Sequence, residues 1–180
     1  MTKKQKKEYR RALLRGTPFQ RATQIRDISK ELVMALSESR DDVDFAPFGD
    51  GCSPEAIAKA EGRLGVTFPP SYVWWLKHYG GGSVGGREIY SVYEDFYEPG
   101  MGDAVSFPGD ITFVAERNRR RGASRSKLEI MSVDGDEIFY FDTSQRSEDG
   151  EWPIYLIESG SDEAVVYAKD FLEFLHKVIA

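Results

Sequence analysis

The sequence contains few of the residues that build covalent or metal-supported sites. Its 180 residues include one cysteine, Cys52, and two histidines, which excludes an internal disulfide and leaves too few thiols for a zinc ribbon. No apolar run approaches the roughly 20 residues that span a bilayer, and no apolar segment of a secretory signal follows the basic N-terminus. These features predict a soluble, cytoplasmic protein, for which we expect no metal and no cofactor.

The charge is distributed unevenly around a net value of −6. Residues 1–26 contain nine basic side chains and one acidic one, so they carry +8 and residues 27–180 carry −14. A body this acidic repels nucleic acid and attracts a basic protein partner. The exception is a basic island over residues 117–127, which contains no aromatic residue on which a base could stack. A solvated helix end therefore explains the island better than RNA binding does.

Composition divides the chain into three parts. Residues 1–17 form a basic arm, which is either a charged helix or disordered. Residues 18–49 contain a predicted helix over 18–38 and most of a linker, rich in Asp and Gly, that spans 39–52. Residues 50–180 then form the main domain, in which the structural patterns are sharper.

Two helices and the segment between them are predicted at the start of this domain. Ser53 can cap a helix with Pro54 in its first turn, and Gly65 can end it in a left-handed conformation. Pro70 can open the next helix because it cannot donate a hydrogen bond inside one. Helical spacing then places an aromatic and apolar stripe on one side of it, made of Tyr72, Trp75, Leu76 and Tyr79.

The second half of the domain alternates strands with two further helices. Asp110 can cap a helix that runs to about Arg121, and Asp134-Gly135 predicts a tight hairpin turn. An acidic loop over 94–109 precedes that helix. The predicted strands are Arg87–Tyr93, Leu128–Val133, Asp136–Asp142, Trp152–Glu158 and Ala164–Tyr167, and a helix over 168–179 closes the chain. Helices before and after a largely hairpin-connected sheet predict an α+β fold.

Three patterns that suggest chemistry have simpler explanations. Gly80, Gly82 and Gly85 match a dinucleotide-binding motif, but the predicted helix precedes them and the strand follows, which is the reverse of the required order. Cys52 and His78 could form a nucleophile pair, although nothing identifies a third group that would orient them. Acidic clusters at 134–137 and 148–151 lack the ligand spacing of a calcium loop, so turns and solvated loops explain them better.

Residues 53–82 resemble the signature of the SUKH superfamily, the Smi-one/Knr-four-like group. In that signature a helix ends in Leu-Gly, a Phe-Pro-x-x-Tyr segment follows, and a second helix ends in Gly-Gly. The matching positions are Glu61, Leu64, Gly65, Phe68, Pro69, Tyr72, Leu76, Gly80 and Gly81. The hairpin over Leu128–Asp142, the segment Asp149–Pro153 and the closing helix follow in the same order as in the family. The resemblance covers about residues 50–180 and implies a single SUKH-like domain whose matching aromatic residues lie in the core.

The resemblance also implies a function. Bacterial members of the superfamily are immunity proteins that bind and neutralise toxins, often nucleases, of polymorphic and contact-dependent toxin systems, while a fungal branch acts in cell-wall and signalling regulation. We therefore expect a cytoplasmic, non-enzymatic immunity protein that binds a basic cognate toxin, with no direct contact to nucleic acid or membrane. The expected contacts are acidic loop residues: Glu94, Asp95, Glu98, Asp103, Glu148, Asp149, Glu151, Asp162 and Glu163. Two alternatives stay open: an adaptor or regulatory scaffold with the arm as a second docking site, and an enzyme that uses Cys52.

Overall fold

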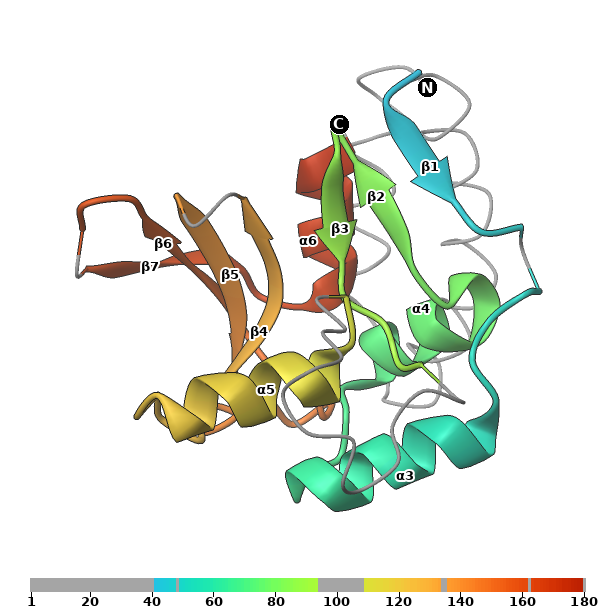
Figure 1. The fold of residues 1–180 in the computed structure, drawn as a ribbon, viewed down its shortest axis with the longest axis horizontal. Coiled ribbons are helices and arrows are strands. Elements are labelled where there is room, and N and C mark those ends of the chain that lie inside the picture. The colour runs from blue at the N-terminus through green and yellow to red at the C-terminus, as the bar shows by residue number, and fades with distance from the viewer. Residues whose placement is uncertain (1–40, 48, 94–108, 134–135, 162, 180) are drawn as a thin grey trace.

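The computed structural model of the protein describes residues 41–47, 49–93, 109–133, 136–161 and 163–179. These residues form four helices and two antiparallel sheets, which confirms the α+β prediction (Figure 1). The predicted basic arm, the helix over 18–38 and nearly all of the acidic loop lie outside the described residues. The helices are α3 (Pro54–Leu64), α4 (Pro70–Tyr79), α5 (Ile111–Arg120) and α6 (Phe171–Ile179).

The strands form one small sheet and one larger sheet. The first has three strands in the order β1-β2-β3, and the second has four in the order β4-β5-β6-β7. Each strand of the larger sheet is therefore hydrogen-bonded to the next one in the chain. The strands are β1 (Val43–Phe45), β2 (Gly82–Val84), β3 (Arg87–Ile89), β4 (Lys127–Val133), β5 (Glu137–Asp142), β6 (Ile154–Glu158) and β7 (Ala164–Ala168).

Three helices begin or end at the residues that the sequence predicted. The Ser53 hydroxyl accepts a hydrogen bond from the Ala56 N–H at 3.2 Å at the start of α3. Gly65 ends that helix with a φ of 70°, a left-handed conformation that favours glycine. Helix α4 begins at Pro70, and the Asp110 carboxylate caps α5 by accepting from the Phe113 N–H at 2.8 Å.

The segment predicted to be a linker contains a strand and packs against α4. Strand β1 lies inside it and pairs with β2. After β1, the Gly49 N–H donates to the carbonyl oxygen of His78 at 2.8 Å, and the Cys52 N–H donates to that of Leu76 at 2.7 Å. The Leu76 carbonyl also accepts from the Gly80 N–H at 3.0 Å, whereas the His78 carbonyl lies in the last turn of α4, where carbonyl groups lack partners within the helix. The linker prediction was therefore wrong for this part of the chain.

The glycine-rich segment after α4 forms a hairpin that the sequence analysis missed. Strands β2 and β3 are joined by Gly85 and Gly86, whose φ angles of 58° and 75° suit a two-residue hairpin turn. The predicted strand Arg87–Tyr93 ends early, at Ile89. Beyond it, the Tyr90 N–H donates to the carbonyl oxygen of Ile130 at 2.8 Å and so connects the two sheets.

The remaining predicted elements are present with shifted ends. The hairpin of β4 and β5 is confirmed, while β6 begins at Ile154 rather than Trp152 and β7 extends by one residue to Ala168. Helix α6 begins at Phe171 because Asp170 caps it, accepting from the Glu173 N–H at 2.8 Å. In the C-terminal half of the chain, the predicted elements were therefore correct in type and order.

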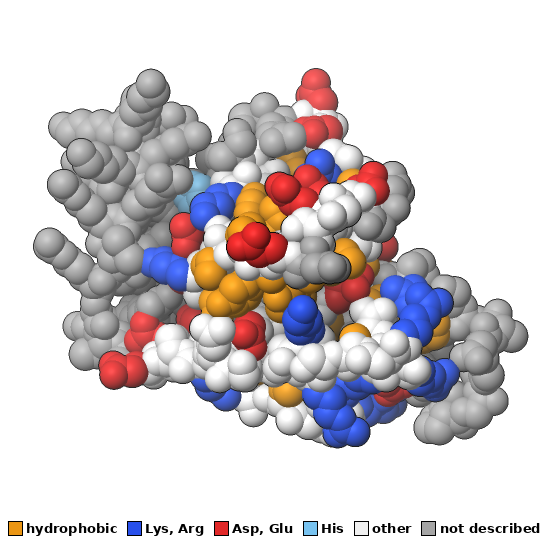
Figure 2. All heavy atoms as spheres, turned by 90° about the vertical axis from the view of Figure 1, so that its left-hand side faces the viewer, with side chains coloured by type: hydrophobic (Ala, Val, Ile, Leu, Met, Phe, Trp, Pro, Cys, Tyr) orange, Lys and Arg blue, Asp and Glu red, His pale blue; other side chains and the backbone are white. Residues whose placement is uncertain are grey.

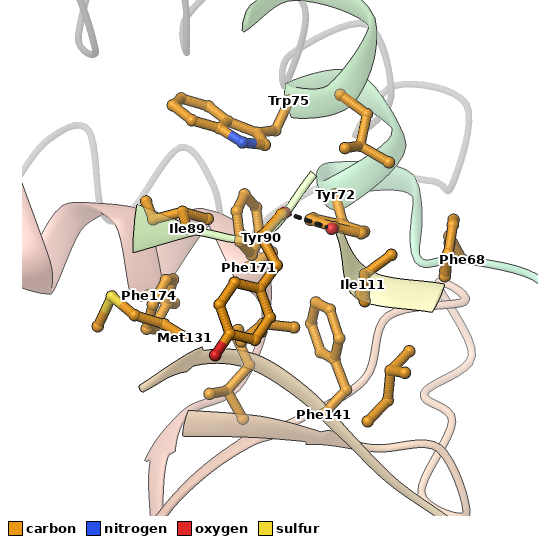
Figure 3. Close-up of a cluster of buried hydrophobic side chains, with 14 of the residues drawn as sticks. Phe68, Tyr72, Trp75, Ile89, Tyr90, Ile111, Met131, Phe141, Phe171 and Phe174 are labelled. Atoms are coloured by element: carbon orange, nitrogen blue, oxygen red, sulfur yellow. Dashed lines mark hydrogen bonds between the residues drawn. The ribbon is translucent and has the colours of Figure 1, made fainter. Parts of the chain in front are cut away.

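An aromatic core joins α4, α6 and the larger sheet. Tyr72 of α4 lies edge-on to Phe141 of β5 and to Phe171 of α6, with ring centroids 5.4 Å and 4.9 Å away. The Tyr72 hydroxyl, which is fully buried, donates to the carbonyl oxygen of Tyr90 at 2.6 Å (Figure 3). Trp75 is also fully buried in this cluster. The prediction that the aromatic stripe of α4 belongs to the core is therefore confirmed.

Candidate functional site

The two faces of the larger sheet differ in what covers them. Phe139 and Phe141 of β5 point to the inner face, where they contact Phe174 and Phe171 of α6 at centroid distances of 5.5 Å and 6.1 Å. Residues between them point to the opposite face, because successive side chains of a strand alternate. On that side α5 lies against β4, where the Asn118 side chain donates to Glu129 at 2.7 Å.

Beyond β4, this opposite side carries apolar and aromatic side chains, and we call it the outer face. It consists of two rows of directly paired residues across β5, β6 and β7. The rows are Ile138, Ile157 and Ala164, and Tyr140, Tyr155 and Val166. None of the six side chains is charged, although the solvated face of an antiparallel sheet is usually polar.

Exposure of the outer face increases towards the sheet edge at β7. Val166 is 62% exposed, Tyr155 and Ile157 are half-buried, and Tyr140 is buried beneath its neighbours. Figure 2 views the side of the molecule where β6 and β7 lie in Figure 1, and it shows hydrophobic side chains gathered at the centre with charged ones around them. Large exposed hydrophobic side chains grouped on one side of a protein are typical of an interaction surface.

A polar network fixes the aromatic part of the outer face at one end. The rings of Tyr140 and Tyr155 stack with centroids 5.7 Å apart, and the Lys127 ammonium lies 5.0 Å from the Tyr140 ring centroid. The Gln145 amide donates to the Tyr155 hydroxyl at 3.0 Å and to the Asp142 carboxylate at 2.8 Å. The two rings are therefore held in place before any partner binds.

Asp142 at this end is favoured in its charged form. Partial burial acts to raise the pKa of Asp142, but hydrogen bonds from Ser144 and Gln145 and the charge of Lys127 outweigh it and lower the pKa. Burial, followed by the negative charge of Asp142, raises the pKa of Tyr140. At neutral pH the network therefore contains a charged Asp142 and a neutral Tyr140.

The other end of the sheet carries acidic side chains, which we call the acidic tip: Asp136, Glu137, Glu158 and Glu163. Glu137 and Glu158 are direct cross-strand partners, an arrangement in which like charges repel. Arg87 of β3 offsets part of this repulsion, with 3.4 Å between its guanidinium and the Glu137 carboxylate. Asp136, Glu158 and Glu163 are exposed, so the tip presents negative charge to solvent.

Basic side chains lie at the opposite end, after α5. Arg121, Arg125 and Lys127 are exposed there, between the last turn of α5 and the start of β4. Arg119 instead binds within the fold, donating to the carbonyl oxygen of Leu64 at 3.2 Å. Lys127 begins β4 and pairs with Asp142 at the end of β5, whereas Glu137 begins β5 and pairs with Glu158 at the end of β6. The basic and acidic groups therefore lie at opposite ends of the strands.

The predicted acidic contacts do not form one surface. Glu163 belongs to the acidic tip, whereas Glu148 and Asp149 lie in the loop between β5 and β6, at the opposite end of β6. About 17 Å separates these ends, since β6 has five residues that each rise about 3.3 Å. The remaining candidates fall outside the described residues: Glu94, Asp95, Glu98, Asp103 and Asp162.

Glu151 requires a correction, because it is buried rather than available to a partner. Only 2% of its surface is exposed, and its carboxylate accepts from the Ser71 N–H at 3.1 Å and from the Ser71 hydroxyl at 2.6 Å. Ser71 lies in the first turn of α4, and Pro69 provides no side-chain cap for this helix. Glu151 therefore caps α4 from a distant loop, where its negative charge also suits the helix dipole.

The residues considered for catalysis or metal binding, Cys52, His78 and His176, lie among other groups of the fold. The Cys52 thiol is half-buried, 3.3 Å from the carbonyl oxygen of Val92 and 3.5 Å from the Ser91 hydroxyl. His78 lies in the last turn of α4 and His176 in that of α6. Within the described part of the chain, no group of three or more metal-ligating side chains could hold an ion. No helix there has the length and apolarity needed to cross a membrane.

An open groove of about 710 Å³ lies between α3 and the loop after β5. Its lining includes Glu61, Arg146 and Trp152. The Glu61 carboxylate accepts from the Phe68 N–H at 2.7 Å and so holds the connection between α3 and α4. Glu61 thus serves the fold, and we take the outer face, where Val166 is exposed among other hydrophobic side chains, as the candidate functional site.

Sequence reasoning missed the outer face, although its pattern was available. Ile138–Phe141 and Ile154–Ile157 are continuous apolar runs, and such runs are expected in strands with both faces covered. The described helices α4 and α6 account for the inner face. The apolar residues at the alternate positions were the signal that the other face is also apolar.

Comparison with known protein families agrees with this architecture. The family model SUKH_6, described as SMI1-KNR4 cell-wall, matches residues 54–175, from the start of α3 into α6. A comparison with curated proteins found no match. The family match covers about two thirds of the chain and includes Gly65 at the end of α3, helix α4, the β4–β7 sheet and the capping residue Glu151. The chain therefore belongs to the SMI1-KNR4 family of the SUKH superfamily.

Proposed function

We propose that the protein is an immunity protein that binds and neutralises a cognate toxin, and that the toxin carries a basic, nuclease-type domain. The observation that carries this proposal is the uncharged outer face next to the acidic tip. Apolar contact supplies affinity, and carboxylates at its border select a basic partner. Family membership supports the proposal because bacterial members of the superfamily are similar to toxin-binding immunity proteins.

Charge supports the choice of a basic partner. Residues 27–180 carry −14, and the described acidic tip concentrates part of that charge beside the outer face. Long-range attraction raises the association rate with a basic domain, and salt weakens it. A nuclease must itself bind phosphate groups, so carboxylates placed at its cleft can occupy the same basic side chains. Neutralisation in the cytoplasm then needs stoichiometric binding and no turnover.

Co-expression with a candidate cognate toxin tests the proposal. Growth should be restored by the wild-type protein, and cells that die equally fast with and without it would refute the proposal for that toxin. Two matched charge reversals then locate the contact. Glu163→Lys at the acidic tip should weaken binding roughly tenfold at low salt, whereas Glu148→Lys at the opposite end should change it less than about twofold. The reverse order would place the partner at the Glu148 end.

The family description favours a second candidate function. It refers to the cell wall, which suits an adaptor or regulatory scaffold of the same fold that binds a non-toxin protein. The outer face serves either role, since both require a protein partner. The basic arm distinguishes them: an adaptor that uses the arm loses its complex when residues 1–26 are deleted. Toxin neutralisation that survives the same deletion favours the immunity role.

A further inference from the structure

The outer face of β5, β6 and β7 has the size, chemistry and charge pattern for one particular kind of ligand. The geometry points to an amphipathic helix of the partner protein, lying along the strands on this face. The inference rests on the proposed function only in assuming a protein partner, and it names the part of that partner that is bound. It also assigns Tyr155, Ile157 and Val166 as the apolar contacts.

The dimensions of the face fit one helix. Adjacent strands lie about 4.8 Å apart, so three strands span about 10 Å between the outer two, close to the 10–12 Å diameter of a helix with its side chains. The five residues of β6 extend about 17 Å, a length that a helix covers in about 11 residues. A second copy of the protein would need a larger contact area than this face, because standard interfaces bury about 800 Å² on each partner.

The rest of the fold supports a helix as the missing layer. A sheet with one apolar face needs one packed layer, and a sheet apolar on both faces needs two. Among the described helices, α6 covers the inner face through Phe171 and Phe174, while on the other side α5 packs against β4, near Glu129. A helix from the partner on β5–β7 would complete the second layer that α5 begins.

The charges at the two ends of the strands give the helix a direction. A helix carries partial positive charge at its N-terminus and partial negative charge at its C-terminus. Asp136 and Glu163, exposed just beyond the strands at the acidic tip, favour the N-terminal end, and Arg125 and Lys127 at the other end favour the C-terminal end. The partner helix should therefore have apolar side chains at i, i+3, i+4 and i+7, basic residues near its start and acidic residues near its end.

Two neighbouring valines provide a matched test. Val165 and Val166 are both exposed, at 49% and 62%, and are the same residue type in the same strand. Val166 is paired with Tyr155 on the outer face, whereas Val165 is paired with Leu156, whose side chain packs in the core on the inner face. Val166→Arg therefore places a charge on the outer face, and Val165→Arg places the same charge on the inner side.

The experiment uses the full-length protein and a displayed library of random 20-residue peptides. We expect the enriched peptides to carry the helical apolar spacing described above. A peptide chosen from them should bind Val166→Arg at least tenfold more weakly than wild type by fluorescence anisotropy, and Val165→Arg within about twofold. Circular dichroism confirms that both variants fold. Enrichment of alternating strand-like peptides, no enrichment, or equal loss in both variants would overturn the inference.

The toxin experiment separates this inference from the proposed function. If no toxin is neutralised but the peptides behave as expected, the proposed function fails and the helix site stands. If the wild-type protein neutralises a toxin and Val166→Arg does so equally well with unchanged affinity, the helix site fails and the proposed function stands.

Discussion

Replacing Glu151 by alanine tests the finding that this carboxylate holds α4 in place. The change removes both acceptors of Ser71, whose N–H and hydroxyl donate to it at 3.1 Å and 2.6 Å. Ser71 is only 2% exposed, so water has little access to these donors. We therefore expect a loss of stability and no specific loss at a binding surface.

The size of the effect follows from the donors that lose their partner. A buried donor without an acceptor costs about 1–3 kcal/mol, and two such donors cost about 2–6 kcal/mol if nothing relaxes. Water entering the space left by the side chain, and relief from burying the carboxylate, reduce this cost. We expect Glu151→Ala to lower the free energy of unfolding by about 3 kcal/mol. Ser71→Ala, which removes one donor, should cost about 1 kcal/mol.

Urea denaturation followed by tryptophan fluorescence measures these changes, because Trp74 and Trp75 lie in α4 itself. In the double variant the hydroxyl that lost its acceptor is absent, so the combined cost should fall below the sum of the single costs by about 1 kcal/mol. Glu148→Ala, an exposed neighbour in the same loop, should stay within about 0.5 kcal/mol of wild type. Glu151→Ala with wild-type stability and weaker partner binding would restore the sequence-based view of Glu151 as a contact residue.

Three further predictions concern the backbone, alkaline pH and the thiol. Gly51→Ala should destabilise the protein by more than about 3 kcal/mol in denaturant unfolding, because the new Cβ would lie 2.1 Å from the Lys77 carbonyl group, whereas Gly62→Ala, in open space on α3, should stabilise it by about 0.5–1 kcal/mol. Burial raises the pKa of Tyr79 to about 12 and that of Tyr72 well above its ordinary value of about 10. Their contribution to stability is therefore complete below pH 10 and is lost as the pH rises towards the folded-state values, so the tyrosinate absorbance of Tyr79, taken as the difference between wild type and Tyr79→Phe, should appear together with the loss of near-ultraviolet circular dichroism. Separate transitions would contradict this. Cys52→Ser should leave toxin neutralisation unchanged in the growth assay, and a loss of activity in a folded variant would support an enzyme.

The elements with local determinants were predictable from the sequence. Helix α3 is fixed by Ser53 at its start and Gly65 at its end, and both act through bonds and dihedral angles within a few residues. The β4–β5 hairpin follows from the Asp134-Gly135 pair between two apolar runs. Such features need no knowledge of the rest of the fold, which explains why their positions were correct to within a few residues.

Features that depend on distant contacts were not predictable. Strand β1 has only three residues, and its pairing with β2 across the intervening helices gives it no local pattern. Glu151 lies in an acidic loop and looks like a surface residue, yet its carboxylate caps α4 through Ser71, which lies 80 residues earlier. Sequence reasoning assigned the acidic residues by composition alone, so it could not separate the exposed Glu163 from the buried Glu151.

The outer face shows how an apolar pattern can indicate a partner rather than a core. In β5, Phe139 and Phe141 are explained by α6, but Ile138 and Tyr140 are not explained by any described helix. If these outer positions served only the stability of the free protein, polar residues would be expected there, because exposed positions tolerate them at little cost. Charged residues are absent from all six paired positions of the outer face, and four of the six are aliphatic, including Val166 at 62% exposure. Packing among the described residues does not account for that composition, whereas the helix site proposed above would.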